Sequence, residues 1–116
     1  MRILVADDQM KVRSALRLLL EQETDLPVVG EAADATDLLL AVVEKAPDVV
    51  MLDWELPGLP ATQLLHLLRH KQPSLKIIAM SGRPEARQAA LEAGVVAFVS
   101  KSEPPEKMLA VICSLF

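Results

Sequence analysis

Hydrophobic residues occur in short, nearly continuous runs that alternate with segments carrying a single apolar stripe. The runs lie near residues 3–6, 28–32, 49–52, 77–80 and 95–99 and are rich in valine and isoleucine. Continuous hydrophobicity of this length is typical of strands in a sheet that is covered on both faces. Between the runs, apolar residues recur with helical spacing, as in Val12, Leu16, Leu19 and Leu20. The pattern therefore predicts alternating strands and helices.

Turn and capping residues support these boundaries. Asp34 or Asp37 suits the start of the second helix, and Gly94 suits the end of the fourth. Pro104 and Pro105 stand where the last helix should open, since proline is accepted in the first helical turn. The chain therefore reads as one domain over residues 1–116, with no internal linker or repeat.

Repeated strand–helix units predict a parallel sheet with right-handed crossovers and helices on both faces. The second run contains Gly30 and Glu31, is the least apolar of the runs, and reads as an edge strand. The fold class we expect is α/β: a flavodoxin-like (βα)5 fold with a doubly wound parallel five-stranded sheet in the order 2-1-3-4-5. In that order the first and third strands lie side by side where ligands bind.

Acidic residues follow two of the predicted strands directly. Asp7 and Asp8 come after the first run, and Asp53 comes after the third. Carboxylates that converge at one sheet edge repel one another unless a cation neutralises them. Ligands that are all oxygen favour Mg²⁺ or Ca²⁺ over zinc or copper, and magnesium uses only one or two protein carboxylates. We therefore expect a magnesium site formed by Asp7, Asp8 and Asp53.

Composition limits the other classes of function. The chain has 116 residues and a formal net charge of −4, which argues against direct nucleic-acid binding. No apolar stretch approaches the roughly 18 residues of a membrane span, and no secretory leader follows Met1, so a cytoplasmic protein without membrane contact is expected. The single cysteine, Cys113, excludes an internal disulfide and is predicted to be buried in an apolar helix face.

The chain resembles the receiver domain of two-component response regulators over its whole length. The resemblance rests on residues that follow successive strands: the acidic pair Asp7 and Asp8, then Asp53 with Leu56-Pro57-Gly58 after it, Ser81, and Lys101. The run Val28-Val29-Gly30-Glu31-Ala32 is similar to the NarL-like branch, whose receivers usually precede a helix-turn-helix DNA-binding domain. These 116 residues contain no such domain, so the chain is either a fragment or a stand-alone receiver.

The resemblance assigns a role to each of these residues. Asp53 would accept a phosphoryl group from a sensor histidine kinase, so the chain would be a phosphorelay signalling domain and not an enzyme. Mg²⁺ would be bound by Asp8, Asp53 and the main-chain carbonyl of Glu55, with Asp7 acting through water. Lys101 and Ser81 would each contact a phosphoryl oxygen. The aromatic switch position is occupied by Phe98, which would move when Ser81 turns inward and alter the face that controls an output.

Two further predictions concern the surroundings of the site. Glu55 and Arg83 carry opposite charges beside the expected path of an attacking water, and could pair and set the lifetime of the phosphoryl group. The apolar tail from Val111 to Phe116 suggests a phosphorylation-dependent homodimer through the face around Phe98 and the last helix. The residue after Lys101 is Ser102, where receivers usually have proline after a cis bond.

Each assignment has an alternative. Asp8 could cap the first helix, and His66 and His70, at i and i+4, could hold a metal. A flavin or nucleotide binder would share the fold, but the loop Asp7-Asp8-Gln9-Met10 lacks the glycine, serine or threonine of a phosphate loop. A hydrolase of the haloacid dehalogenase type has acids spaced Asp-x-Asp, which the adjacent pair here does not match.

Overall fold

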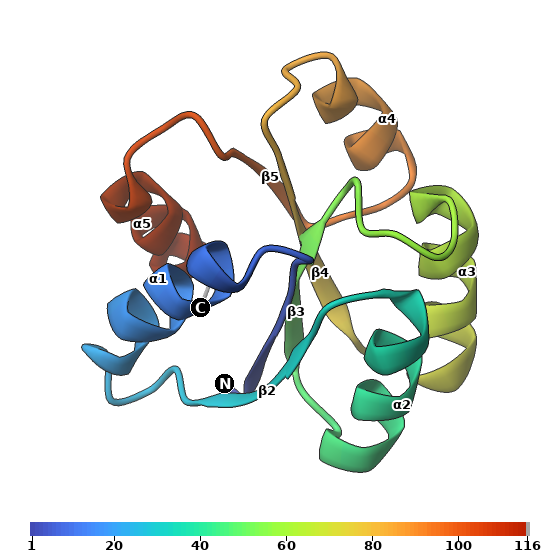
Figure 1. Ribbon diagram of the computed structural model, residues 1–116, viewed down its shortest axis with the longest axis horizontal. Helices are drawn as coiled ribbons and strands as arrows, with labels where there is room; N and C mark the ends of the chain where they lie inside the picture. Colours follow the sequence, from blue (N-terminus) through green and yellow to red (C-terminus); the bar gives the residue numbers. More distant parts are fainter. Residues whose placement is uncertain (116) are drawn as a thin grey trace.

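A single parallel sheet forms the centre of the molecule (Figure 1). The computed structural model describes residues 1–115, and all neighbouring strands within them are parallel. The sheet order is β2-β1-β3-β4-β5, which confirms the predicted order and places β2 at an edge. The strands are β1 (Ile3–Ala6), β2 (Val28–Ala32), β3 (Val49–Asp53), β4 (Lys76–Ser81) and β5 (Ala97–Ser100).

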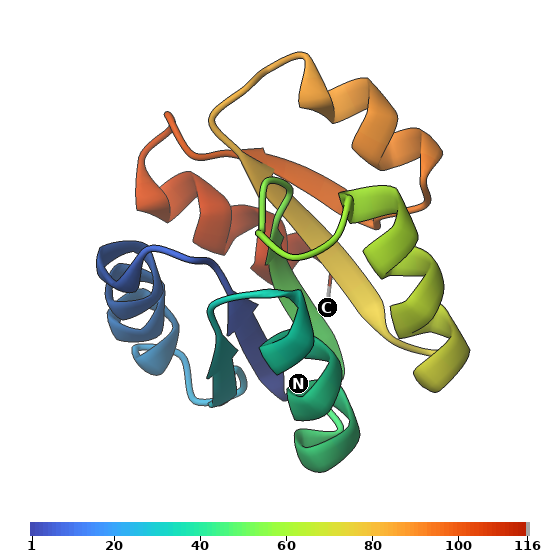
Figure 2. The same ribbon diagram turned by 45° about the vertical axis from the view of Figure 1, so that its right-hand side comes forward.

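Helices cover both faces of the sheet, as expected for a doubly wound fold. They are α1 (Met10–Glu21), α2 (Ala35–Lys45), α3 (Ala61–Lys71), α4 (Ala86–Glu92) and α5 (Pro105–Leu115). Figures 1 and 2 show α1 and α5 together on one face and α2, α3 and α4 on the other. One apolar core lies on each side: Leu16, Leu20 and Ile112 belong to the first, and Leu38, Leu64 and Leu68 belong to the second.

Local sequence accounts for several of the helix ends. The side chain of Asp34 accepts a hydrogen bond from the main-chain N–H of Asp37 at 2.8 Å, so Asp34 is the cap of α2. Gly94 has φ +97°, the left-handed conformation that favours glycine, and follows the end of α4 as predicted. Pro105 is the first residue of α5.

The structure departs from the sequence-based expectations at the C-terminal end. β5 begins at Ala97 and not at residue 95, because Val95 and Val96 still belong to the turn after α4. The prediction that Cys113 is buried is wrong: its side chain is exposed, because the inward face of α5 is formed by Met108 and Ile112. Phe116, the last residue of the predicted apolar tail, lies outside the described part of the chain.

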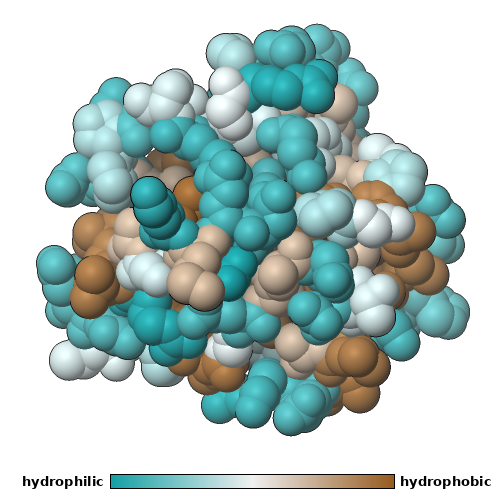
Figure 3. Space-filling view, viewed as in Figure 1, coloured by the Kyte–Doolittle hydropathy of each residue, from teal (hydrophilic) through white to brown (hydrophobic). Residues whose placement is uncertain are grey.

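Apolar side chains also reach the surface. Figure 3 shows hydrophobic residues over α1 and α2, separated by hydrophilic ones. They include Met10 and Leu18 on α1, and Leu40 and Val43 on α2. Within residues 1–115, none of the helices is long and apolar enough to cross a bilayer.

Candidate functional site

Three carboxylates meet at the carboxyl ends of β1 and β3. Asp7 directly follows β1 and Asp53 is the last residue of β3, so the parallel pairing of these strands places the two side by side. One oxygen from each of Asp7, Asp8 and Asp53 lies within 4.8 Å of the others. Asp7 is completely buried and Asp53 is 3% exposed, whereas Asp8 is open to solvent. The cluster is therefore a largely buried concentration of negative charge with one solvent-facing side.

Main-chain groups hold two of these carboxylates in place. Asp7 Oδ1 accepts a hydrogen bond from the N–H of Gln9 at 2.9 Å, and Asp53 Oδ1 accepts one from the N–H of Glu55 at 3.0 Å. Asp7 Oδ2 is buried, and its partner among the described residues is the ammonium of Lys101. A buried carboxylate is costly unless a positive charge lies beside it. The all-oxygen donor set of the cluster fits a hard divalent cation such as Mg²⁺.

Lys101 supplies the positive charge of the site. Its Nζ lies 2.5 Å from Asp7 Oδ2 and 3.3 Å from Asp53 Oδ2. The main chain of the same residue donates to the carbonyl of Ser81 at 2.9 Å, which fixes the loop after β5 against the end of β4. The peptide bonds of the described residues are all trans, including the one between Lys101 and Ser102.

Burial and charge shift the pKa values of two groups. Burial raises the pKa of Asp53 above 3.8, and the nearby Asp7 charge adds to this, although the hydrogen bond from Glu55 and the charge of Lys101 act in the opposite direction. For Lys101, burial alone would lower the pKa. Its interactions with Asp7 and Asp53 outweigh burial and raise the pKa above 10.5, so Lys101 remains an ammonium ion.

Ser81 ends β4 and is completely buried. Its Oγ lies 2.9 and 3.0 Å from the two carboxylate oxygens of Glu55, to which it donates, and it accepts from the N–H of Arg83 at 3.0 Å. The structure thus brings Ser81 to the same edge as Asp53, since β3 and β4 are neighbours. The contact between Ser81 and Glu55 was not predicted from the sequence, because spacing shows only that the two residues share an edge.

The predicted ion pair between Glu55 and Arg83 is not formed in the structure. Arg83 Nε lies 3.2 Å from Glu85 Oε1, and Glu55 is engaged with Ser81. Glu85 is only two residues from Arg83, so this pair forms within one short loop. The main-chain hydrogen bond at Glu85 and the charge of Arg83 lower the pKa of the Glu85 carboxyl.

Two alternative roles can be compared with the structure. Gln9, not Asp8, precedes α1, and Asp8 makes no hydrogen bond or ion pair with the described residues, so Asp8 does not cap the helix. His66 and His70 are exposed on α3, and within residues 1–115 the acidic cluster is the only group of three or more side chains placed to hold a metal ion together. Asp8 is thus left free for a ligand.

A side chain that sequence analysis missed also contacts the site. The guanidinium of Arg13 in α1 donates to the main-chain carbonyl of Asp7 at 2.6 Å and to Glu31 at 3.0 Å. Arg13 lies one helical turn from Arg17, which also binds Glu31. This spacing indicates that both arginines lie on one side of α1. Nothing in the sequence indicates that one of them contacts the acidic loop.

The family of the chain is decided by comparison with known proteins. Residues 3–113 match the family model of the response regulator receiver domain. The chain belongs to this family. The acidic cluster, Ser81 and Lys101 therefore occupy the carboxyl-end edge of a receiver fold.

Individual relatives of this receiver include regulators with other domains. It is 32% identical over 111 residues to an uncharacterized transcriptional regulatory protein, YhcZ, of Bacillus subtilis, covering 94% of this chain and 52% of the relative. The transcriptional regulatory protein DesR of the same organism is 32% identical, with 97% of this chain and 57% of the relative covered. The chain thus spans about half the length of these relatives.

Solved structures agree with this assignment. The isolated receiver domain of RcsB from Salmonella enterica, determined with a beryllofluoride phosphomimetic, superposes with a TM-score of 0.91 at 28% identity, covering 99% of this chain and 87% of that one. Regulators described as LuxR family and NarL are also among the matching structures. The receiver is therefore of the NarL-like type, as the sequence indicated.

Phe98, the predicted switch residue, lies in β5. Its side chain is 9% exposed and belongs to the core that includes Ala86 and Ala90 of α4. The guanidinium carbon of Arg87 lies 5.9 Å from the centre of the Phe98 ring, within the range of a cation–π contact. Phe98 is thus packed under α4, with Arg87 above it.

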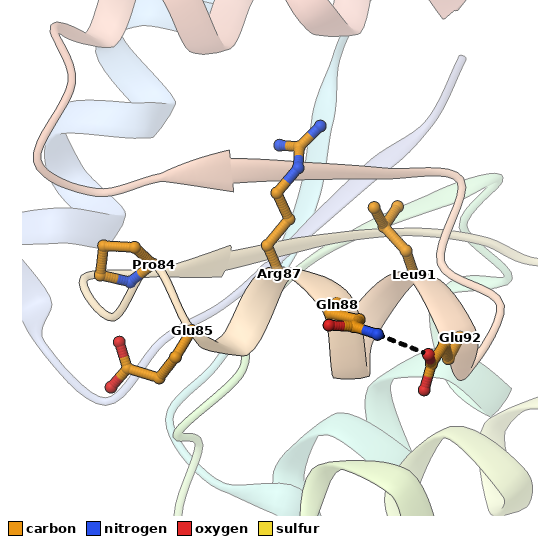
Figure 4. A pocket seen from close by; sticks show the side chains of 6 residues that line it. All are labelled: Pro84, Glu85, Arg87, Gln88, Leu91 and Glu92. Atoms are coloured by element: carbon orange, nitrogen blue, oxygen red, sulfur yellow. Dashed lines mark hydrogen bonds between the residues drawn. The ribbon is translucent and has the colours of Figure 1, made fainter.

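The outer side of α4 carries a hollow of about 490 Å³. Figure 4 shows the residues that line it and a hydrogen bond between Gln88 and Glu92, 3.1 Å long. Arg87 belongs to this hollow and also to a neighbouring one of about 280 Å³ that includes Phe98. Arg87 therefore links the surface of α4 to Phe98, the predicted switch residue.

Proposed function

We propose that this receiver accepts a phosphoryl group on Asp53 from a sensor histidine kinase, in a reaction that requires Mg²⁺. The observation that carries the proposal is the geometry around Asp53: carboxylate oxygens of Asp7 and Asp8 lie within 4.8 Å, and the ammonium of Lys101 lies 3.3 Å away. Phosphoryl transfer depends mainly on positioning and on neutralising charge, which this arrangement provides.

In the proposed reaction, a carboxylate oxygen of Asp53 attacks the phosphorus of a phosphohistidine. A P–O bond forms, the P–N bond breaks, and the imidazole of the kinase leaves. Mg²⁺, held by Asp8, Asp53 and the main-chain carbonyl of Glu55, with Asp7 through water, would offset the charge on the phosphoryl oxygens. Lys101 would pair with another of these oxygens, which its raised pKa supports because it keeps the ammonium charged.

Phosphorylation would then change the conformation of Ser81 and Phe98. The hydroxyl of Ser81 would break its hydrogen bond to Glu55 and donate to a phosphoryl oxygen, and Phe98 would move toward the space that Ser81 leaves. Because Phe98 is covered by Arg87, this movement would alter the surface of α4 together with β5 and α5. We propose that a phosphorylation-dependent homodimer forms through this face.

The output we propose is control of transcription through a DNA-binding domain that is not among these 116 residues. Relatives described as transcriptional regulators support this output, and RcsB has been solved bound to promoter DNA. The net charge of −4 favours contact with DNA only through that other domain. A cytoplasmic location follows from the same proposal.

A direct test uses acetyl phosphate and Mg²⁺, followed by intact mass measurement. We expect one labile phosphoryl group on the parent protein and none on Asp53→Asn, whose amide has nearly the same shape but is not nucleophilic. A flavin binder would gain no mass, and a haloacid dehalogenase-type hydrolase would consume many equivalents of acetyl phosphate. Equal labelling of Asp53→Asn and parent would disprove the assignment of Asp53.

A further inference from the structure

Arg13 forms a bridge between the acidic loop and β2. Its Nη1 donates to the main-chain carbonyl of Asp7 at 2.6 Å, and its Nε donates to Glu31 Oε1 at 3.0 Å. The side chain of Arg13 is only 14% exposed, so the guanidinium is mostly shielded from water. We infer that Arg13, held by Glu31, is a positioning residue that aims Asp7 and Asp8 for metal binding; this rests on the proposed magnesium site.

Besides Arg13, two hydrogen bonds hold the acidic loop, and one of them runs from the N–H of Gln9 to Asp7 Oδ1 at 2.9 Å. The N–H of Asp7 donates to the carbonyl of Ala32 at 3.0 Å, which holds the end that leads in from β1. The other end leads to Asp8, which is exposed and unpaired within the described chain. Of these contacts, only the bond from Arg13 holds the carbonyl of the peptide between Asp7 and Asp8, so it helps to orient that peptide plane.

The start of α1 shows the same dependence on Arg13. Gln9 precedes the helix without a side-chain capping hydrogen bond, and the first turn contains no acidic residue. Arg13 lies near the start of α1, and its side chain extends back to the preceding loop. It therefore connects the helix to the acidic pair Asp7 and Asp8. Groups behind the metal ligands commonly control affinity in this way, by fixing ligand orientation.

Glu31 makes this arrangement compatible with a cation. A free guanidinium beside a metal site would repel Mg²⁺, but the Glu31 carboxylate accepts from Arg13 and offsets its charge. Arg17 also donates to Glu31 and is paired with Glu21 as well. Arg17 provides a matched control: it binds the same Glu31, at 2.9 Å, but does not reach the Asp7 carbonyl. The two arginines thus share Glu31 and differ in their other contact, which is the Asp7 carbonyl for Arg13 and Glu21, at 3.7 Å, for Arg17.

The sign of the change in Mg²⁺ affinity distinguishes positioning from charge. If Arg13 acts by positioning, Arg13→Met should weaken Mg²⁺ binding about tenfold, measured by titration calorimetry, and Arg17→Met should stay within about twofold. Arg13→Lys should also weaken Mg²⁺ binding, because an ammonium cannot donate to Glu31 and to the Asp7 carbonyl with the geometry of the planar guanidinium. If Arg13 acts only as a charge, Arg13→Met should strengthen binding and Arg13→Lys should leave it unchanged.

Two further measurements separate positioning from general damage to the fold. Thermal unfolding in EDTA reports the stability of each variant without metal, and acetyl phosphate labelling at saturating Mg²⁺ should recover the parent rate in Arg13→Met. Adding Glu31→Gln to Arg13→Met should cause no further loss, since the two residues act as one unit. Parent-like affinity of Arg13→Met overturns the inference while leaving the magnesium site in place, and a parent protein that binds no Mg²⁺ overturns both.

Discussion

The hydroxyl of Ser81 is held by the carboxylate of Glu55, whose two oxygens lie 2.9 and 3.0 Å from Ser81 Oγ. Ser81 is completely buried, and its hydroxyl is the group proposed to move to the phosphoryl oxygen. The main chain of Glu55 also donates to Asp53, so one residue contacts both the proposed phosphoacceptor and the proposed switch hydroxyl. In the proposed reaction, Glu55 would therefore compete for the hydroxyl that the phosphorylated state requires.

Removing this competing acceptor should favour the phosphorylated state. A hydrogen bond to a charged group contributes about 1.5 kcal/mol at the lower end of its range. We therefore expect Glu55→Ala to bind beryllofluoride up to about tenfold more tightly than the parent, measured by titration in the presence of Mg²⁺. Tighter binding follows because Ser81 no longer has to leave an anionic partner.

Two controls separate the hydrogen bond from the charge. Glu55→Gln loses the charge but keeps an oxygen that accepts from Ser81, so its affinity should rise less than that of Glu55→Ala. Glu85→Ala removes a carboxylate that binds Arg83 and does not touch Ser81, so it should behave like the parent. Equal gains in all three variants would mean that loss of negative charge, and not release of Ser81, is responsible.

The raised pKa of Asp53 predicts how stability depends on pH. At a pH above 3.8, the Asp53 carboxyl loses its proton more readily in the unfolded chain than in the folded protein. The free energy of unfolding therefore falls as the pH rises from 3.8 through the raised pKa of Asp53. Asp53→Asn removes this loss. Without Mg²⁺, its Tm should exceed that of the parent at pH 7, and the difference should vanish as pH falls toward 3.8.

The control for this experiment is Asp25→Asn, which changes an exposed carboxylate. Its Tm should follow the parent across the same pH range, measured by scanning calorimetry in EDTA. A Tm for Asp53→Asn that is below the parent's at pH 7 would show that the contact with Lys101 outweighs the cost of burying the Asp53 charge.

The sequence predicts the architecture well because the relevant signals are local. Apolar runs define the strands, Asp34 and Gly94 mark helix ends, and adjacency in a parallel sheet brings together acids that follow different strands. β5 and Cys113 were less well predicted. Hydrophobic residues near the end of the chain do not reveal where a turn stops or which side of α5 faces the sheet.

Side-chain partners at the site could not be predicted in the same way. Sequence spacing places Glu55, Ser81 and Arg83 at one edge, but opposite charge alone predicted a pair between Glu55 and Arg83 that the structure does not contain. Arg83 binds the nearer Glu85, and Glu55 satisfies the buried Ser81 hydroxyl. A buried hydroxyl needs a partner more than an exposed guanidinium does, because water can replace the partner of the latter.

Trp54 should report metal binding at the site. It directly follows Asp53, its side chain is half-buried, and its main-chain N–H donates to the carbonyl of Met80 at 2.8 Å. It is the only tryptophan in a chain without tyrosine, so its emission is free of overlap. We expect Mg²⁺ titration to change this emission, with a much weaker response in Asp8→Ala, which lacks the free carboxylate of the site.

Trp54→Phe is the matched control and should give no signal while binding Mg²⁺ as the parent does. Calorimetry performed alongside separates the reporter from the site. An unchanged emission at millimolar Mg²⁺, with binding heat present, would exclude Trp54 as a reporter and leave the metal site unaffected.

Beryllofluoride should promote self-association through the face formed by α4, β5 and α5. Phe98 is packed beneath Arg87, and Leu91 is exposed beside Arg87 in the hollow shown in Figure 4. We expect light scattering at tens of micromolar protein to show a monomer without the mimic and a two-fold dimer with it. Leu91→Ser should weaken this dimer. Leu40→Ser changes an exposed leucine of α2, outside the proposed face, and should leave the dimer intact. A monomer under both conditions would contradict the proposed dimer, and equal loss in both variants would place the contact outside this face.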